Sequence, residues 1–368
     1  MRFDRAGRPF ERAEGLLHAA VHGGIELSKN VLVTGAAGFI GSHTVEALLA
    51  RGDEVIAIDN LDPYYDVAQK RANLAEIEVA ADGRRYSFIE GDIRDEKLIR
   101  RIFSERKLDV VIHLAAMAGV RASIEQPQLY FDVNMGGTLN LLEAARTCGL
   151  GHFVFASTSS VYGNSVRLPF HEDMPADRQL SPYAVTKRAG ELLGHTYHHL
   201  YGQNFTSLRL FTVYGPRNRP DMMAFKLLHS IFSGQELPLY GGGNMYRDWT
   251  YVADTVSGIL AAADRPLGYE TFNLGRGESV LLLEFVRTME ELVGRKARLV
   301  AMPKLDLDAA ATQADVGKAR QLLGYAPKVS IMDGLFHCWR WYRRAVLGVE
   351  EPIIRLSRDG DPSLRLPQ

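Results

Sequence analysis

A glycine-rich turn between an apolar strand and a helix constrains this chain more than any other feature. Residues 31–41 read Val-Leu-Val-Thr-Gly-Ala-Ala-Gly-Phe-Ile-Gly, and an apolar-periodic run follows over 43–50. Gly35 permits a tight turn, Gly38 leaves room for a pyrophosphate beside the backbone, and Gly41 lets the helix pack close to the strand. The helix N-terminus then presents free N–H groups to an anion. The pattern therefore predicts a strand–turn–helix unit that binds a dinucleotide.

The next apolar strand, over residues 54–59, ends in an acidic residue. A carboxylate at Asp59 would accept hydrogen bonds from the adenosine ribose hydroxyls and would repel a 2′-phosphate. This residue therefore predicts NAD rather than NADP as the cofactor. A structural turn followed by a helix-capping aspartate would leave the same local pattern.

Composition limits the class of protein and its compartment. The chain has 368 residues and a formal net charge of −1, which argues against a nucleic-acid binder held by phosphate contacts. Its two cysteines, Cys148 and Cys338, lack zinc or disulfide spacing, so we interpret both as buried apolar residues in a reducing cytoplasm. No apolar run reaches membrane-spanning length, and the N-terminus lacks an apolar signal core. We expect a cytoplasmic protein with no membrane partner.

Strand and helix patterns alternate from Asn30 onward, which indicates a parallel sheet covered on both faces. Beyond about residue 212 glycine and proline become denser, which favours a smaller lobe of loops, short helices and strand pairs. We expect an N-terminal extension over 1–28, in which 11–20 could form a short helix. A dinucleotide-binding domain would follow over 29–211, and some later segments would return to it. The rest would be a substrate-binding lobe over 212–345 and a tail over 346–368.

A hydroxyl, a phenol and an amine follow the glycine-rich turn in an order that suits proton transfer. Apolar residues 153–156 lead into Ser-Thr-Ser-Ser-Val-Tyr-Gly, which places Thr158 at a strand end. Downstream, Pro182 marks a helix start, and Tyr183 and Lys187 then share one helical face. A neighbouring ammonium and the positive nicotinamide of the cofactor would both lower the pKa of the phenol and make it a base near neutral pH. A lone Tyr/Lys pair is more often packing plus a solvated charge, but this context favours catalysis.

These motifs together resemble the extended short-chain dehydrogenase/reductase family, in its nucleotide-sugar epimerase and dehydratase branch, over about residues 30–345. The segments that carry the resemblance are Thr34–Gly41, Asp59–Asn60, Gly91–Ile93, His113–Ala116, Asn134 and the set Thr158, Tyr183 and Lys187. The resemblance implies an α/β fold with a Rossmann-type doubly wound parallel sheet and a smaller C-terminal substrate-binding lobe. It also implies a homodimer formed through helices near 139–147 and 183–201.

The same resemblance assigns residues to the cofactor and to catalysis. It implies that Asp92 and Ile93 lie by the adenine and that Lys187 also holds the nicotinamide ribose. The full set expected to bind NAD is Gly35, Gly38, Phe39, Ile40, Gly41, Asp59, Asn60, Asp92, Ile93, Leu114, Ala115, Ala116, Met117, Asn134, Tyr183, Lys187 and Phe211. The expected catalytic residues are Thr158, Tyr183 and Lys187.

The strand end after Thr158 bears on the reaction type. Sugar dehydratases of this family resemble Thr-Asp-Glu-Val-Tyr-Gly there, and decarboxylases usually carry a Glu before the Val, whereas this chain has Thr-Ser-Ser-Val-Tyr-Gly over 158–163. Elimination would lack its acid/base pair, so we expect 4-epimerisation. Tyr183 would take the C4 hydroxyl proton, bound NAD would take the hydride, and the planar 4-keto sugar would rotate before hydride returns to its opposite face.

The substrate signal follows the last strand of the first domain. Residues 219–222, Arg-Pro-Asp-Met, are similar to the corresponding stretch of UDP-glucuronate 4-epimerases. The resemblance implies that a sugar carboxylate is held by Ser159, Ser160, Thr212 and Arg219, and the UDP diphosphate by Arg247. A surface arginine in a proline-rich loop is the structural alternative for Arg219. A polar residue expected near Leu305 is missing, and Lys304 could replace it.

Other readings of the chain stay open at this point. The same reaction could act on UDP-glucose and UDP-galactose, or on acidic and neutral sugars alike. A ketosugar reductase that consumes external NADH and a non-catalytic NAD-binding module are further alternatives. His195, His198 and His199 lack an acid or cysteine at ligand spacing, so we expect no metal site.

Overall fold

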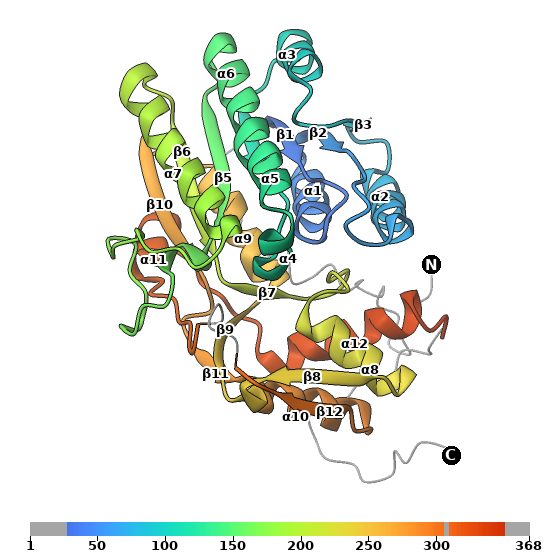
Figure 1. Ribbon diagram of the computed structural model, residues 1–368. Coiled ribbons are helices and arrows are strands. Elements are labelled where there is room, and N and C mark those ends of the chain that lie inside the picture. The colour runs from blue at the N-terminus through green and yellow to red at the C-terminus, as the bar shows by residue number, and fades with distance from the viewer. Residues whose placement is uncertain (1–27, 305–308, 350–368) are drawn as a thin grey trace.

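The computed structural model describes residues 28–304 and 309–349 and builds them around a seven-stranded parallel sheet (Figure 1). Its strands are β1 (Asn30–Thr34), β2 (Glu54–Asp59), β3 (Tyr86–Glu90), β4 (Val110–His113), β5 (His152–Thr158), β6 (Phe205–Leu210) and β10 (Tyr269–Leu274). Their order across the sheet is β10-β6-β5-β4-β1-β2-β3. The order reverses between β1 and β4, and such a switch point opens a crevice at the carboxyl ends of the strands. The expected doubly wound α/β fold is confirmed.

Helices cover both faces of this sheet because its strands alternate buried side chains to either side. Val31 and Val33 of β1 belong to one core, and Leu32 belongs to the other. The first core is covered by α1 (Phe39–Arg51), α2 (Val67–Ala81), α9 (Val252–Ala263) and α11 (Gly317–Leu323). The second is covered by α3 (Glu96–Glu105), α6 (Thr138–Cys148) and α7 (Pro182–Tyr201).

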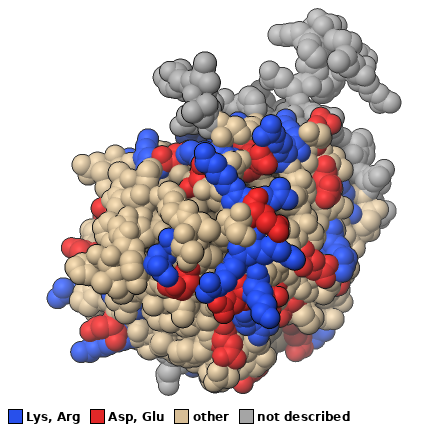
Figure 2. All heavy atoms as spheres, turned by 90° about the horizontal axis from the view of Figure 1, so that it is seen from above, with Lys and Arg blue, Asp and Glu red and all other residues tan. Residues whose placement is uncertain are grey.

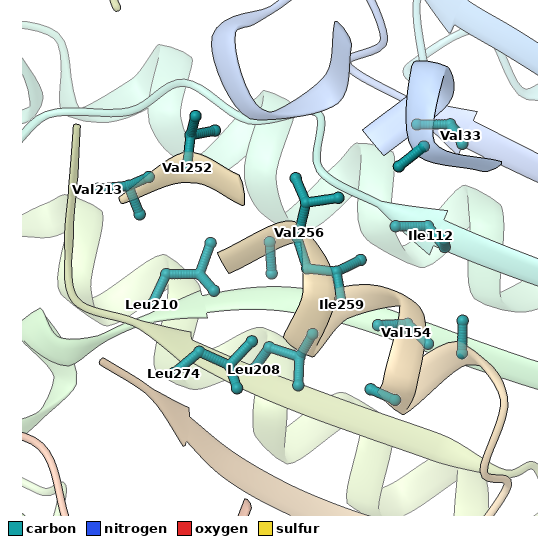
Figure 3. Packing of buried hydrophobic residues seen from close by; sticks show 14 of the residues in the cluster. Val33, Ile112, Val154, Leu208, Leu210, Val213, Val252, Val256, Ile259 and Leu274 are labelled. Carbon is teal, nitrogen blue, oxygen red and sulfur yellow. The ribbon is translucent and has the colours of Figure 1, made fainter. Parts of the chain in front are cut away.

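Two elements that come late in the chain complete this layer. Helix α9 packs on the sheet, where Val256 and Ile259 lie close to Val154 and Leu208 (Figure 3). Strand β10 pairs in parallel with β6 at the edge. Both come after residues 212–251 of the smaller lobe and before residues 279–302, which return to that lobe, so the chain crosses between the two parts more than once.

The rest of the chain forms a second layer at the carboxyl ends of the parallel strands (Figure 1). It contains β7 (Thr212–Tyr214), β8 (Glu236–Tyr240), β9 (Tyr246–Tyr251), β11 (Ser279–Leu281), β12 (Arg298–Met302), α8 (Met223–Ser233), α10 (Leu282–Val293) and α12 (Ile331–Ala345). A separate core holds it together, with the Trp249 and Phe285 rings stacked at 3.9 Å and Tyr214 packed edge-on against both.

Short helices link these layers around the crevice. They are α4 (Val120–Glu125), α5 (Pro127–Phe131), a π-helical turn over Asp132–Gly137, and 3-10 turns over Ser159–Tyr162 and Gly241–Gly243. On the face seen in Figure 2, Lys and Arg side chains are interspersed with Asp and Glu. Within the described ranges we find no helix with the length and apolar character that crossing a bilayer requires.

Some expectations fall on residues outside the described ranges. These are residues 1–27, which hold nearly all of the N-terminal extension and its possible helix, residues 305–308, where uridine contacts were in doubt, and residues 350–368 of the tail.

Candidate active site

A cavity of about 370 Å³ lies at the carboxyl ends of the central strands, where the switch point predicts a ligand. The structure gathers most of the predicted site residues in its wall. These are Gly35, Gly38, Phe39, Ile40, Gly41, Asp59, Asn60, Asp92, Ile93, Leu114, Ala115, Ala116, Met117, Thr158, Ser159, Ser160, Tyr183, Lys187, Phe211, Thr212 and Arg219. A second cavity, of about 770 Å³, opens at the amino ends of the strands and contains none of them.

The glycine-rich turn forms a tight cradle at one end of the cavity. Gly35 has a φ of +72°, and a Cβ there would lie 2.7 Å from the backbone nitrogen of Ala115. A Cβ on Gly41 would overlap the carbonyl oxygen of Gly35. Gly38 caps helix α1 with no side-chain hydrogen bond, so the first N–H groups of the helix stay available to an anion. These residues fit the pyrophosphate of a dinucleotide.

The acidic residue at the end of β2 is fixed by the backbone around it. Asp59 accepts hydrogen bonds from the backbone nitrogens of Ala37 at 3.1 Å and Leu61 at 2.8 Å. Lys70 of α2 is buried, and its ammonium nitrogen lies 3.7 Å from Asp59 Oδ1. Burial raises the pKa of Asp59, and the charge of Lys70 opposes that shift.

Lys70 also lines the cavity, and sequence reasoning missed it. Its local sequence, Val-Ala-Gln-Lys-Arg-Ala, is typical of an exposed helix and does not indicate a contact with Asp59. Only the packing of α2 beside β2 brings this lysine to Asp59.

A buried histidine ties the glycine-rich turn to the wall of the cavity and was likewise missed as a site element. The Nδ1 atom of His113 lies 2.7 Å from Thr34 Oγ1, and its Nε2 atom lies 2.9 Å from Thr138 Oγ1. Burial and the charge of Lys187 lower the pKa of His113 to about 3, so the ring is neutral. Since Thr138 donates to the carbonyl oxygen of Asn134, we assign the proton of the ring to Nε2.

Asn134 does not line the cavity, although the sequence placed it at the cofactor. It lies in the π-helical turn, where its amide accepts from the backbone nitrogen of Met117 at 2.8 Å and donates to Met117 O at 3.0 Å. It also donates to Thr186 Oγ1, also at 3.0 Å. Asn134 therefore holds the cavity wall at Met117 against the helix that carries Tyr183.

The residues predicted to transfer a proton come from two adjacent elements. Strand β5 ends at Thr158, and α7 begins with Ser181 as its cap, which accepts from the Ala184 backbone nitrogen at 3.2 Å. Tyr183 and Lys187 then face the cavity one helical turn apart. The Tyr183 ring packs edge-on against Tyr130 at 6.3 Å.

The pKa of Tyr183 differs from the expectation. The sequence predicted a pKa lowered by Lys187 and by a bound nicotinamide. The structure tests the first of these charges, and in it burial is the largest effect and raises the pKa. A hydrogen bond with Thr158 and the charge of Arg219 oppose the shift. The reason is that Lys187 is itself buried: its pKa is lowered to about 7 by loss of hydration. The positive charge that would lower the phenol pKa must therefore come largely from other groups.

Hydroxyl groups and one guanidinium line the far side of the cavity. Ser160 donates its backbone N–H to Thr158 Oγ1 at 3.2 Å, and Thr158 Oγ1 donates to Ser160 Oγ at the same distance. Arg219 forms a two-point ion pair with Asp221, with both N–O distances 2.8 Å. Arg219 is therefore a cavity residue that carries an internal counter-ion, rather than a solvated surface arginine.

The loop that carries Arg219 is anchored to the helices below the sheet. Arg217 is buried at a φ of +61° and binds Glu46 of α1 and Glu76 of α2. Gln69 of α2 donates to the carbonyl oxygens of Arg217 and Asn218, each at 3.1 Å. These contacts fix the loop against the nucleotide-binding layer.

Arg247 lies on β9 and is not part of the cavity wall. Its Nη1 donates to the Tyr246 carbonyl oxygen at 2.8 Å. Its neighbour Asp248 is fully buried and accepts from the backbone nitrogens of Arg276, Gly277 and Ala314. Asp248 therefore joins β9 to the turn at 276–277 and to the segment at Ala314.

The histidines of α7 and the two cysteines lie outside the cavity wall and contact other parts of the protein. The His195 ring stacks on His199 and packs edge-on against Tyr269, and His198 Nδ1 lies 3.0 Å from the Gln203 carbonyl oxygen. Cys338 is buried as expected, but the expectation for Cys148 is wrong, because it is exposed at the last turn of α6.

Comparisons with known proteins agree with this geometry. Residues 31–275 match the model of the NAD dependent epimerase/dehydratase family. The chain belongs to this family. The match spans the glycine-rich turn, the Thr158, Tyr183 and Lys187 set, and Arg219, so the expected dependence on NAD is confirmed at the level of the family.

Individual relatives narrow the comparison. The UDP-glucuronate 4-epimerase of Thermodesulfobacterium geofontis is 42% identical over 316 residues, which cover 86% of this chain and 96% of that protein. The UDP-glucuronate 4-epimerase 4 of Arabidopsis thaliana is 39% identical over 350 residues, 90% of this chain and 78% of that protein. The crystal structure of the UDP-glucuronic acid 4-epimerase of Bacillus cereus with UDP-glucuronic acid and NAD superposes with a TM-score of 0.80 at 36% identity, covering 86% of this chain and 99% of that one.

Proposed function

We propose that this chain is an epimerase that interconverts UDP-glucuronate and UDP-galacturonate through NAD-dependent oxidation and reduction at C4. The relatives named above carry that activity in their names, and the Bacillus cereus structure contains UDP-glucuronic acid and NAD. One observation carries the proposal. The base set Thr158, Tyr183 and Lys187 shares a single cavity with Arg219 and a row of hydroxyl groups.

The cavity residues divide the chemistry among them. Bound NAD would supply the oxidant that accepts hydride from C4 and returns it. Tyr183 takes the proton of the C4 hydroxyl and gives it back, with Thr158 bonded to the phenol. Lys187, fixed by a hydrogen bond to Ala156 O at 2.8 Å, lies one turn away on the same helical face. The Gly35, Gly38 and Gly41 cradle and Asp59 would hold the dinucleotide.

The reaction stops at epimerisation because the strand end offers hydroxyl groups and no carboxylate. Ser159 and Ser160 stand where an elimination needs acidic side chains. The 4-keto form of glucuronate is a β-keto acid, and it loses carbon dioxide when its carboxylate-bearing bond aligns with the carbonyl π-system. Ser159, Ser160, Thr212 and Arg219 would hold the carboxylate out of that alignment.

Activity on UDP-glucose and UDP-galactose alone is not favoured. A neutral hexose has no carboxylate for the Arg219 guanidinium, which would then stay in the cavity wall without a partner from the substrate. The UDP-glucose 4-epimerase structures from Thermotoga maritima and Thermus thermophilus are 32% and 34% identical to this chain, below the relatives with UDP-glucuronate in their names. A reductase that needs external NADH finds no support in the comparisons.

The decisive experiment incubates the purified protein with UDP-glucuronate, without added cofactor, and identifies products by NMR. We expect UDP-galacturonate. Arg219→Ala should reduce kcat/KM for the acidic sugar far more than for UDP-glucose, whereas Arg100→Ala, an exposed arginine on α3, should change neither. Equal loss with both sugars would refute the substrate assignment, and turnover only with added NADH would indicate a reductase.

We also propose that the two layers bind different ligands. Residues 29–211, with α9 and β10, would bind NAD, and most of 212–345 would bind the UDP-sugar. Arg247 of β9 would reach the diphosphate, since a guanidinium binds two phosphate oxygens at once. Arg247→Ala should then raise KM for UDP-glucuronate and leave the bound NAD content unchanged, and a loss of NAD instead would contradict this assignment.

A homodimer in the cytoplasm completes the proposed function. Apolar side chains on α6 and α7 are exposed, with Leu139 at 42%, Leu192 at 52% and Leu200 at 59%. Two copies could bury this surface against each other. Light scattering should give the dimer mass for the native chain and the monomer mass for Leu192→Glu. The free cysteines Cys148 and Cys338 are typical of a reducing compartment.

A further inference from the structure

The guanidinium of Arg219 is bound along one edge by a carboxylate two residues later in the chain. Its Nε donates to Asp221 Oδ1 and its Nη2 donates to Asp221 Oδ2, both at 2.8 Å. Such a two-point contact fixes the plane of a guanidinium as well as its position. Arg219 lines the cavity, but Asp221 is not among the lining residues. Asp221 therefore binds the edge of the guanidinium that does not face the cavity.

The pairing leaves a second edge of Arg219 for a ligand. A guanidinium carries five N–H groups, and Asp221 uses one on Nε and one on Nη2. The two N–H groups of Nη1 remain, and the second one of Nη2 contacts only a weak acceptor, Met222 Sδ at 3.6 Å. One N–H from each of these two nitrogens therefore forms another fork of the same geometry. The guanidinium of Arg219 can thus bind Asp221 through its Nε–Nη2 edge and a substrate carboxylate through its Nη1–Nη2 edge.

A tyrosine from the nucleotide-binding layer supports the pair from the cavity side. Tyr64, in the loop after β2, lines the cavity, and its ring centre lies 5.8 Å from the Arg219 guanidinium carbon. Its hydroxyl lies 3.5 Å from Asp221 Oδ2. Burial would raise the pKa of Asp221, but the hydrogen bonds and charge of Arg219 outweigh it and lower that pKa. Asp221 is therefore a carboxylate at neutral pH.

We propose that Asp221 is a positioning residue that sets the orientation in which Arg219 grips the carboxylate of the 4-keto sugar. This inference depends on the proposed function. With Asp221 in place, the guanidinium of Arg219 has a single orientation, and the substrate carboxylate bound to its free edge is fixed as well. The C5–C6 bond of the sugar is then held away from the carbonyl π-system. Without it, the guanidinium can turn, and the substrate carboxylate turns with it.

The loss of that restraint opens a defined side reaction. When the C5–C6 bond aligns with the C4 carbonyl, its electron pair enters the π-system, carbon dioxide leaves, and the resulting enolate takes a proton at C5. The product is UDP-4-keto-pentose, or UDP-pentose once hydride returns to C4. The ratio of these pentose products to UDP-galacturonate therefore reports on the orientation of the carboxylate, which a general loss of stability would not change.

The test compares Asp221→Asn with the native enzyme, using UDP-glucuronate and NMR analysis of products. We expect the pentose share to rise about tenfold or more, since small misplacements have large effects on competing reactions. Asp221→Ala should show the same rise, and Asp221→Glu, which keeps a carboxylate, should return the share toward the native value. Glu96→Gln, the same chemical change at an exposed arginine pair on α3, serves as the matched control.

The outcomes separate this inference from the proposed function. An unchanged pentose share in Asp221→Asn or Asp221→Ala would overturn the positioning role, and so would an equal rise in Asp221→Glu. If the native enzyme forms no UDP-galacturonate, the proposed function itself fails. The Asp221 side chain is 36% exposed in its pair with Arg219, so its removal should lower the melting temperature only slightly.

Discussion

The ammonium nitrogen of Lys187 lies 2.8 Å from the carbonyl oxygen of Ala156 and 4.9 Å from the centre of the Phe155 ring. The side chain is buried against β5, with no carboxylate among the groups that shift its pKa. Loss of hydration lowers the pKa of Lys187 to about 7. The structure therefore contains a lysine whose charge depends on pH near neutrality.

This burial predicts a pH-dependent stability of the cofactor-free protein. In the unfolded chain lysine keeps a pKa of about 10.4, so above pH 7 the unfolded state binds a proton that the folded state lacks. The free energy of unfolding should therefore rise with pH between 7 and 9, by at most about 1.4 kcal/mol per pH unit. Denaturant titration of the native chain and of Lys187→Met should show this slope only for the native chain. Parallel curves would mean that the pKa is not lowered.

Tyr183 should carry the proton transfer. Tyr183→Phe removes the phenol oxygen and keeps the ring that packs on Tyr130, so we expect kcat to fall about 10²- to 10⁴-fold with bound NAD retained. Tyr201→Phe, at the exposed end of the same helix, is the matched control and should keep full activity. Activity of Tyr183→Phe near the native level would exclude Tyr183 as the base.

The glycine cradle should be sensitive at Gly41. Gly41→Ala places a methyl group against the Gly35 carbonyl oxygen, so the turn must shift away from the pyrophosphate position. We expect the purified variant to retain much less NAD, measured by absorbance after denaturation. Gly136→Ala, where an added Cβ meets no atom within 4 Å, should keep its NAD. Equal NAD content in both variants would contradict this account of the turn.

Arg217 should stabilise the loop that carries Arg219. Arg217→Met removes hydrogen bonds to Glu46 and Glu76 from a buried guanidinium, and we expect the free energy of unfolding to fall by about 2–3 kcal/mol. Arg344→Met, which removes an exposed arginine from the same Glu76, should cost less than about 1 kcal/mol. Similar losses in the two variants would show that burial of Arg217 contributes nothing.

The sequence predicted those parts of the site whose geometry is local. A glycine turn between a strand and a helix, and a tyrosine and a lysine four residues apart on a helix, have nearly the same shape in any fold that contains them. The alternation of strand and helix patterns along the chain likewise indicated the parallel sheet. Thr158 could be placed because a strand end lies close to the next helix start.

Other parts of the site depend on contacts between distant segments. Lys70 reaches Asp59 because α2 packs beside β2, and His113 joins Thr34 to Thr138 across β4, β1 and α6. Lys187 does not lower the pKa of Tyr183 as expected, because burial, which no spacing reveals, outweighs nearby charge.

By itself, the sequence determined the fold class and the class of cofactor, and it predicted the base that moves a proton, because each follows from short-range backbone and side-chain geometry. Only the tertiary structure decided how these groups are charged and held: which side chains lose water, and that Asp221 binds the far edge of Arg219 while Tyr64 approaches from another loop. Loss of hydration and long-range contacts arise only when the chain folds.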